Sequence, residues 1–430
     1  MEIKEQSALR KVLSDTELPR MCLIRQVFKR DGIGDVPSVL REKLDREDLK
    51  SRIQPGMTVV LTGSSRQISH MPEILRELAD FVKARGGKPV IIPAMGSHGG
   101  STDEGQRAIL EGYGITEEFC GCPIHSSMKT VKVGYMSNGD EVRMDAFAHA
   151  ADAIIVVGRI KAHTAFRGPY ESGLVKMMAI GMGKQEGAES LHRSGFGEMA
   201  KRLPEYARIV FEHCHVIFGV APIENEFDQT CRLEVLPAEE IFEKEPELLL
   251  YAKSRLPRIL LPETDVLAVH EIGKNFSGSG MDPNVTGTFG TPYATGGIKK
   301  QRTAVLDISR ESHGSYIGLG MADMTTKRAF EKLDTNATYF NMITSTVLCV
   351  GKIPMVLETD KMALQAAVRT LTNVDRAHVR MVYLKNTLSL ENIMISEAFL
   401  PDVRGRDDIE VLEEPRELRF DAEGTLLDFA

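Results

Sequence analysis

The chain places a lysine between two histidines, in a segment otherwise rich in glycine and methionine. His163, Lys176 and His192 lie within thirty positions, and Lys176 stands in the run Gly-Leu-Val-Lys-Met-Met. These apolar neighbours predict that the ammonium group is at least partly desolvated, and burial disfavours the charged form of an amine. Such a lysine is nucleophilic near neutral pH. The segment therefore predicts a metal site or a covalent-cofactor site.

A third histidine lies upstream in a glycine-rich turn. His98 is flanked by Ser97 and Gly99 in the run Met-Gly-Ser-His-Gly-Gly-Ser-Thr. Glycines let a ligand approach the backbone closely, and a helix N-terminus, which the sequence predicts to follow, favours an anion. An exposed turn histidine without a function is the alternative interpretation.

Each residue of the lysine segment also has a purely structural interpretation. His163 would be a strand-end histidine bonded to the backbone, and His192 a solvated histidine on a helix. Lys176 would be a helical lysine whose stem packs on apolar surface while its ammonium group reaches water. The alternation of glycine and methionine up to Gly183 instead favours a close-packed loop around a bulky ligand.

Three short apolar runs must position these residues. Residues 57–62, 88–93 and 153–157 are predicted strands, and a helix with apolar residues at helical spacing covers 71–82. This alternation favours a parallel α/β sheet. Arg66, His98 and His163 each follow one of the strands. Ligands of such sheets bind outside the carboxyl ends of the strands, so we expect the three side chains to converge.

The length of 430 residues accommodates two large domains. We expect two α/β domains with mostly parallel sheets and the active site in the cleft between them. Residues 1–260 would form the cofactor-binding domain. Residues 261–430, which begin near Pro257 and Pro262 with another predicted strand, would close over the substrate.

Composition excludes several classes of protein. A net charge of −8 without a basic run argues against nucleic-acid binding. The sequence contains no run of eighteen apolar residues, so no transmembrane helix is predicted. The N-terminus lacks the apolar core of a signal peptide. Six scattered cysteines indicate reduced thiols and a cytoplasmic protein. The phosphate-binding GxxxxGK[ST], nucleophile GxSxG and zinc HExxH motifs are absent from the sequence.

The order Ser97-His98, His163-x-x-Phe166, Lys176, His192 resembles the nickel-pincer lactate racemase family over about residues 55–200. The resemblance implies a nickel-pincer nucleotide that Lys176 holds through a thioamide link. The nickel would be bound by one carbon and two sulfurs of the nucleotide and by His192. The resemblance also makes His98 and His163 the two acid/base residues.

The resemblance further assigns the cofactor's surroundings. Arg66, in Gly63-Ser-Ser-Arg66, matches the arginine of the family's Asp-x-Thr-Arg motif and would bind the cofactor or the substrate carboxylate; Ser97 and Gly99 would contact the cofactor. Two departures stand out: Gly63 replaces the aspartate, and residues 167–170 form an insertion.

The substrate implied by the resemblance is a small 2-hydroxy acid. Met281-Asp282-Pro283-Asn284 is similar to the family's Asp-x-Asn segment, and Lys274, Asp282 and Asn284 are the expected substrate ligands of the second domain. Residues 285–290 lack the tyrosine, glutamine and lysine that follow this segment in lactate racemase. A substrate longer or more polar than lactate is therefore expected. The enzymes that make the cofactor are the expected partners.

The chemistry is consistent with the residue types. Inversion at C2 removes a hydride and returns it to the other face, with the nickel cofactor as the hydride acceptor, and two histidines can exchange the hydroxyl proton at neutral pH. Two alternatives remain. A zinc hydrolase or lyase would use His98, His163 and His192 as three metal ligands. A non-enzymatic protein would bind a nucleotide or another anion at its glycine-rich loops.

Overall fold

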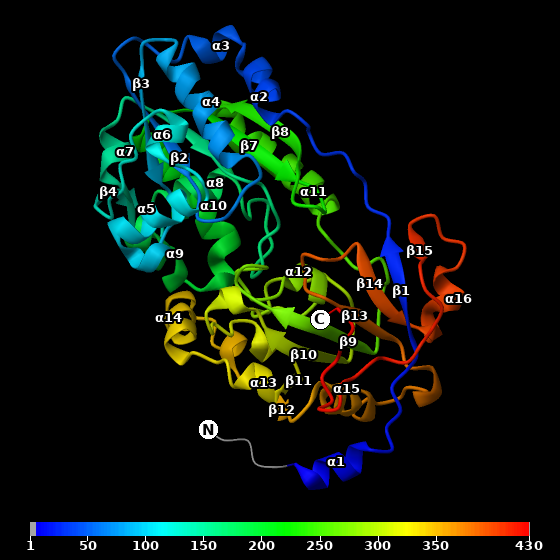
Figure 1. Cartoon of the computed structure of the whole chain (residues 1–430). Helices are drawn as coiled ribbons and strands as arrows, with labels where there is room; N and C mark the ends of the chain where they lie inside the picture. The colour runs from blue at the N-terminus through cyan, green and yellow to red at the C-terminus, as the bar shows by residue number, and fades with distance from the viewer. Residues whose placement is uncertain (1–5, 430) are drawn as a thin grey trace. The chain divides into compact units, whose positions relative to one another are not determined.

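A computed structural model of the chain describes residues 6–429, which form two compact units (Figure 1). One unit is Arg30–Leu256. The other combines the segment that ends at Lys29 with the segment that begins at Pro257. The sequence assigned residues 1–29 to the N-terminal domain. The structure places residues 6–29 with the second unit, because strand β1 (Met21–Gln26) pairs there with β14 (Asn392–Ser396).

The unit Arg30–Leu256 is built on a five-stranded sheet in the order β3-β2-β6-β7-β8. All neighbouring strands in it are parallel except β7 and β8. Its strands are β2 (Thr58–Gly63), β3 (Lys88–Pro93), β6 (Ala153–Val157), β7 (Val216–Glu224) and β8 (Thr230–Pro237), with a separate hairpin of β4 (Thr130–Tyr135) and β5 (Glu141–Asp145). The predicted parallel α/β sheet is confirmed.

Helices connect these strands and cover both faces of the sheet (Figure 1). They are α2 (Val36–Leu44), α3 (Glu47–Lys50), α4 (Met71–Lys83), α5 (Asp103–Gly112), α6 (Glu117–Cys120), α7 (Ala146–Ala150), α8 (Leu174–Lys176), α9 (Lys184–Arg193), α10 (Phe196–His213) and α11 (Ile241–Ser254). A 3-10 turn (Gly99–Ser101) precedes α5, and a π-helical turn (Met177–Gly181) follows α8.

Strand β6 shows why both faces are apolar. Ile154 and Val156 join the core cluster that includes α10, whereas Ile155 and Val157 join the cluster that includes α2 and α4. Successive side chains of a strand point to opposite faces, so a strand covered on both sides reads as a continuous apolar run. That is the pattern from which the strand was predicted.

The second unit contains an eight-stranded sheet in the order β12-β11-β10-β9-β13-β14-β1-β15. The strands from β12 to β13 are parallel, and the remaining pairs are antiparallel. Its remaining strands are β9 (Val266–Ile272), β10 (Arg302–Ile308), β11 (Met324–Thr326), β12 (Met355–Leu357), β13 (Met381–Leu384) and β15 (Ile409–Val411). Its helices are α1 (Ser7–Leu13), α12 (Pro283–Thr286), α13 (Lys327–Phe330), α14 (Thr335–Ser345), α15 (Asp360–Arg369) and α16 (Leu400–Val403).

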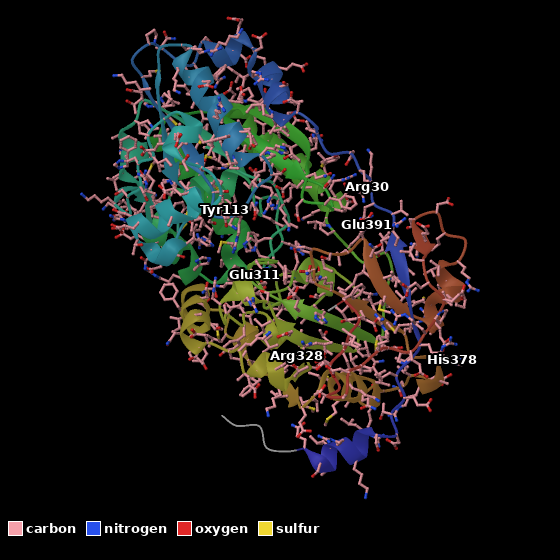
Figure 2. All side chains as sticks on the ribbon, in the orientation of Figure 1. Arg30, Tyr113, Glu311, Arg328, His378 and Glu391 are labelled. Atoms are coloured by element: carbon pink, nitrogen blue, oxygen red, sulfur yellow. The ribbon has the colours of Figure 1, made fainter. Side chains whose placement is uncertain are left out.

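Polar residues inside this second unit form ion pairs. Arg328, labelled in Figure 2, contacts the carboxylates of Asp307 and Asp360 at 3.1 and 2.8 Å.

Within residues 6–429, no helix combines the length and apolar content that a bilayer crossing requires. All six cysteines are free thiols.

Candidate functional site

Three loops meet at the carboxyl ends of the central strands β3, β2 and β6. Arg66 follows β2, His98 follows β3, and the segment that leads to His163 follows β6. The three strands are parallel neighbours, so their carboxyl ends lie along one edge of the sheet.

The three loops and helix α8 enclose a cavity of about 200 Å³. Arg66, His98 and Lys176, all expected from the sequence, line it together. The other lining residues are Ser64, Ser65, Ile68, Ala94, Met95, Arg159, Lys161, Ser172, Gly173, Met177, Ile180 and Gly181. All of them belong to the unit Arg30–Leu256, and the predicted position of the site between two domains stays a prediction.

The cavity wall is strongly cationic. Arg66, Arg159, Lys161 and Lys176 contribute four positive groups, and the lining residues, all of them described, include no carboxylate. Arg159 is paired with Glu224. Sequence reasoning had not assigned a role to Arg159 or Lys161. A wall of this kind favours an anionic ligand such as a phosphate or a carboxylate.

Two hydrogen bonds fix the loop that carries Arg66. The hydroxyl of Tyr113, labelled in Figure 2, donates a hydrogen bond to the carbonyl of Ser65 at 3.2 Å. The Ser64 hydroxyl donates to the Arg66 carbonyl at 3.0 Å. The guanidinium group therefore extends from a fixed turn.

Lys176 ends the short helix α8 rather than lying in a loop, which corrects the sequence-based expectation. The residues from Leu174 to Ile180 include no glycine or proline, so they can continue as a π-helical turn up to Gly181. Burial, and secondarily the charge of Arg66, lowers the pKa of Lys176 from 10.5 to about 8. Its Nζ atom lies 3.4 Å from the hydroxyl of Ser172. A minor fraction of this amine is therefore neutral and nucleophilic near physiological pH, far more than for an ordinary lysine.

The His98 turn holds its imidazole in one tautomer. Nδ1 lies 2.7 Å from the carbonyl of Met95 and must donate to it, because a carbonyl only accepts. In the neutral ring the lone pair is then on Nε2. Gly99 has φ of +67°, and a Cβ there would lie 2.5 Å from the backbone of Gly105, so only glycine fits. Ser97 and Gly99 flank His98 without lining the cavity, and their predicted cofactor contacts stay predictions.

His163 and His192 lie beside Lys176 without lining the cavity. The ring of Phe196 lies near both, with centroid distances of 6.2 Å to His163 and 5.5 Å to His192. Burial, followed by the charge of Lys176, holds the pKa of His163 well below its usual value of 6.5 and also lowers the pKa of His192. Nδ1 of His163 accepts a hydrogen bond from the backbone N–H of Ala165 at 3.1 Å. Both rings are therefore neutral at pH 7.

His192 lies on helix α9, as predicted, with a buried Nδ1 atom. Among the described residues this atom has no hydrogen-bond partner. The carbonyl of Ala188, one turn earlier, opposes the fall in the pKa of the ring. No group of three or more histidine, cysteine, aspartate or glutamate side chains within residues 6–429 is arranged to hold a metal ion. The three-histidine zinc site is therefore not assembled.

Two buried glutamates that sequence reasoning missed organise the lysine segment. Glu171 accepts the backbone N–H of His163 at 2.8 Å and pairs with Lys253 at 2.6 Å. Glu245, on α11, accepts the N–H of Val175 at 2.9 Å and so caps the turn that carries Lys176. Burial raises the pKa of Glu245 to about 7. The sequence offered one signal for Glu171, which is the only charged residue in the run 168–175 before Lys176.

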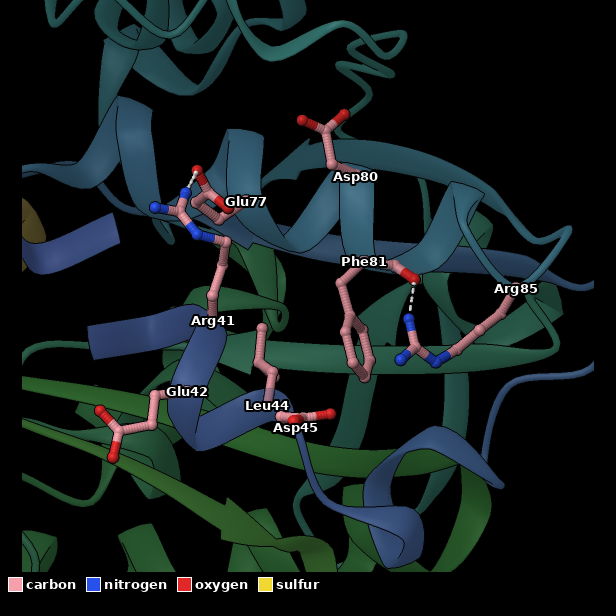
Figure 3. A pocket seen from close by; sticks show the side chains of 8 residues that line it. All are labelled: Arg41, Glu42, Leu44, Asp45, Glu77, Asp80, Phe81 and Arg85. Atoms are coloured by element: carbon pink, nitrogen blue, oxygen red, sulfur yellow. Dashed lines mark hydrogen bonds and ion pairs between the residues drawn. The ribbon is translucent and has the colours of Figure 1, made fainter. Parts of the chain in front are cut away.

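A larger hollow of about 460 Å³ lies elsewhere on the same unit, between α2 and α4 (Figure 3). Arg41 pairs with Glu77 across it at 2.5 Å, and the guanidinium of Arg85 lies over the ring of Phe81. Carboxylates outnumber guanidinium groups in its lining, and none of the residues expected from the sequence lines it. The smaller cavity is therefore the candidate site.

The expected substrate ligands Lys274, Asp282 and Asn284 belong to the second unit. Asp282 caps α12 by accepting the backbone N–H and the side-chain amide of Asn284, each at 2.9 Å. The backbone N–H of Lys274 donates to the Ser312 hydroxyl at 2.8 Å. These bonds explain the loop structure, and the role of the three residues in substrate binding stays a prediction.

A family model matches the part of the chain that contains the candidate site. Residues 17–203 match the family model described as the lactate racemase N-terminal domain. Residues 17–203 are therefore similar to the N-terminal domain of lactate racemases. No curated protein sequence matches the chain.

Two solved structures superpose on this chain at low sequence identity. A protein from Thermotoga maritima superposes with a TM-score of 0.51 and 13% identity, over 85% of this chain and 99% of its own. The lactate racemase apoprotein from Thermoanaerobacterium thermosaccharolyticum has a TM-score of 0.48 and 11% identity, over 82% of this chain and 92% of its own. The first of these supports the fold alone.

Proposed function

We propose that the protein is a racemase or epimerase that inverts C2 of a 2-hydroxy acid, with a nickel-pincer nucleotide linked to Lys176. One observation carries this proposal. A lysine with a lowered pKa and a histidine with its lone pair on Nε2 line one cationic cavity, in a lactate racemase N-terminal domain.

The residues around Lys176 fit this cofactor. A thioamide link needs a neutral amine, and the Lys176 amine is partly neutral at pH 7 to 8. His192 can supply one metal ligand, because burial lowers its pKa and so favours the neutral ring that a metal requires. A single protein ligand suits a metal whose other ligands come from the cofactor.

The histidines would exchange the proton of the substrate hydroxyl. When bound, the cofactor would supply reversible hydride acceptance at C2. His98 would accept the hydroxyl proton at Nε2. His163, whose Nδ1 accepts from Ala165, carries its proton on Nε2 and would be the second residue of this proton exchange. Arg66, Arg159 and Lys161 would neutralise the cofactor phosphate and the substrate carboxylate.

The substrate would be a 2-hydroxy acid longer or more polar than lactate. The mismatch of residues 285–290 with the lactate racemase pattern motivates this proposal. Lys274, Asp282 and Asn284 would provide its additional polar contacts. The enzymes that synthesise the cofactor would be the protein's partners in the cell.

The decisive experiment measures intact mass and nickel content after co-expression with the enzymes that make the nickel-pincer nucleotide. We expect one mass adduct and about one nickel per chain, and loss of both in Lys176→Ala. Lys161→Ala removes another lysine of the same cavity and should keep the adduct, so it is the matched control. No adduct, beside a loaded control racemase, would contradict the proposal.

The cationic wall also supports a second candidate, a protein that binds a nucleotide or another anion without catalysis. The two histidines separate the candidates. An anion-binding protein should keep its full affinity for AMP in His98→Ala and His163→Ala and should not interconvert the enantiomers of any 2-hydroxy acid. The racemase should lose turnover in both variants while keeping its mass adduct.

A further inference from the structure

A buried amide lies directly behind the turn that carries His98. Gln106, on α5, is fully buried, and its Nε2 atom donates to the carbonyls of Gly96 and His98 at 2.8 and 3.2 Å. These two carbonyls flank the residue pair Ser97-His98 on either side. One side chain therefore fixes the backbone on both sides of the catalytic candidate.

A buried lysine fixes the orientation of that amide. Lys184 has no exposed surface, and its Nζ atom donates to the Pro93 carbonyl at 2.5 Å and lies 3.5 Å from Oε1 of Gln106. The ammonium group can only donate, and the carbonyls of the His98 turn can only accept. Only one orientation of the Gln106 amide satisfies both sides, so the lysine prevents the amide from flipping.

The lysine also connects this turn to the helix of the metal-ligand candidate. Lys184 is the first residue of α9, which carries His192 near its other end. The Asp145 carboxylate, also fully buried, compensates its charge at 3.0 Å. Burying an ammonium group is costly even when it is paired, and an apolar residue could fill the same volume. The ion pair with Asp145 fixes the position of Nζ beside the Gln106 amide.

We propose that Gln106, oriented by Lys184, is a positioning residue that holds the His98 turn so that Nδ1 donates to the Met95 carbonyl and Nε2 carries the lone pair. The assignment rests on the proposed function only for the role of His98 as a base. The geometry alone predicts that His98 is protonated at Nδ1 in the cofactor-free protein.

The test is histidine-selective ¹⁵N NMR of the full chain, with the His98 signal assigned from its loss in His98→Asn. Wild-type His98 should show the tautomer protonated at Nδ1. In Gln106→Met, which removes both donors at similar volume, the ratio of Nδ1–H to Nε2–H should fall roughly fivefold, the change expected for losing about one hydrogen bond. Gln185→Met, on the outer part of α9, is the matched control and should leave the ratio unchanged.

A second variant keeps the test valid if Gln106→Met does not fold. In Gln106→Glu the carboxylate can pair with Lys184 but cannot donate to the carbonyls of Gly96 and His98, so the ratio should fall similarly. A folded variant of either kind with the wild-type ratio would overturn the proposal. Loss of the fold in both would also overturn it, because the amide would then hold the fold rather than the histidine. Absence of racemase activity in the wild-type protein would leave this readout intact.

Discussion

The Nδ1 atoms of His98 and His163 have opposite hydrogen-bonding roles. Nδ1 of His98 donates to the carbonyl of Met95 at 2.7 Å, whereas Nδ1 of His163 accepts the backbone N–H of Ala165 at 3.1 Å. In the neutral rings, Nε2 is therefore a base on His98 and a hydrogen-bond donor on His163. For His163 to act as the base on the opposite enantiomer, its bond to Ala165 must first break.

This relationship predicts that both histidines are needed for turnover. In the cofactor-loaded protein, His98→Asn and His163→Asn should each lower kcat by at least about 100-fold, because positioned proton transfer contributes that much or more. Chiral chromatography measures the rate of racemisation, and intact mass verifies that the cofactor remains. The exposed His125, which stacks on Phe147, provides the control His125→Asn. A loss of less than tenfold in either variant would exclude that histidine from proton transfer.

The lowered pKa of Lys176 predicts selective modification. Trace acylation of the cofactor-free protein should label Lys176 with a rate that rises to half its plateau at about pH 8. Ordinary lysines titrate near 10.4, so their rates keep rising beyond that point. Peptide mass spectrometry resolves the sites. Lys184, which is fully buried, should stay unlabelled until the protein unfolds. A Lys176 profile that matches the surface lysine Lys201 would contradict the desolvated amine.

The buried carboxyl of Glu245 predicts a pH-dependent stability. Its pKa of about 7 in the folded protein exceeds its ordinary value of 4.5, so the folded state keeps a proton that the unfolded state has released between these pH values. Stability that is fully present below pH 4.5 is therefore lost as pH rises through 7. The loss amounts to roughly 3 kcal/mol in the free energy of unfolding.

Urea unfolding at pH 5 and pH 8 tests this effect. Glu245→Gln keeps an acceptor for the N–H of Val175 but cannot ionise, so its unfolding free energy should change less between the two pH values than that of the wild type. Glu243→Gln changes an exposed carboxylate on the same helix and should retain the wild-type difference. Equal pH dependence in all three proteins would show that Glu245 is ionised throughout.

The two ends of the unit Arg30–Leu256 are linked, which predicts that it folds alone. Arg255 pairs with Asp31 at 2.7 Å and with Glu226 at 3.0 Å. We expect the excised segment to unfold cooperatively by circular dichroism. A shorter segment, residues 30–240, lacks α11 and with it the Glu245 cap, and should lose cooperativity. A non-cooperative transition in the longer segment would mean that its core depends on the rest of the chain.

The sequence predicted the strands that position the site better than the local structure around Lys176. Strands 88–93 and 153–157 were recognisable because buried parallel strands are continuous apolar runs, and they place His98 and His163 after their carboxyl ends. The short helix of Lys176 was missed because glycines on both sides suggested a loop, whereas the residues between them favour a helix.

Long-range contacts explain why the other residues around the site were missed from the sequence. Glu245 meets the lysine turn from seventy residues away, and Gln106 meets Lys184 from seventy-eight. Neither spacing leaves a periodic signal in the sequence, because tertiary packing alone brings these residues together. The zinc alternative failed for a similar reason, since spacing along the chain does not show whether three rings face one point.

Strand β1 is synthesised first, yet its partners β14 and β15 are made among the last described residues. While the ribosome translates the intervening chain, the apolar sequence Met-Cys-Leu-Ile has no neighbouring strand to pair with. The whole unit Arg30–Leu256 emerges in that interval and can complete its cavity early. The nascent protein thus has a period in which the candidate site can already be complete while an apolar strand is still unpaired and prone to aggregation.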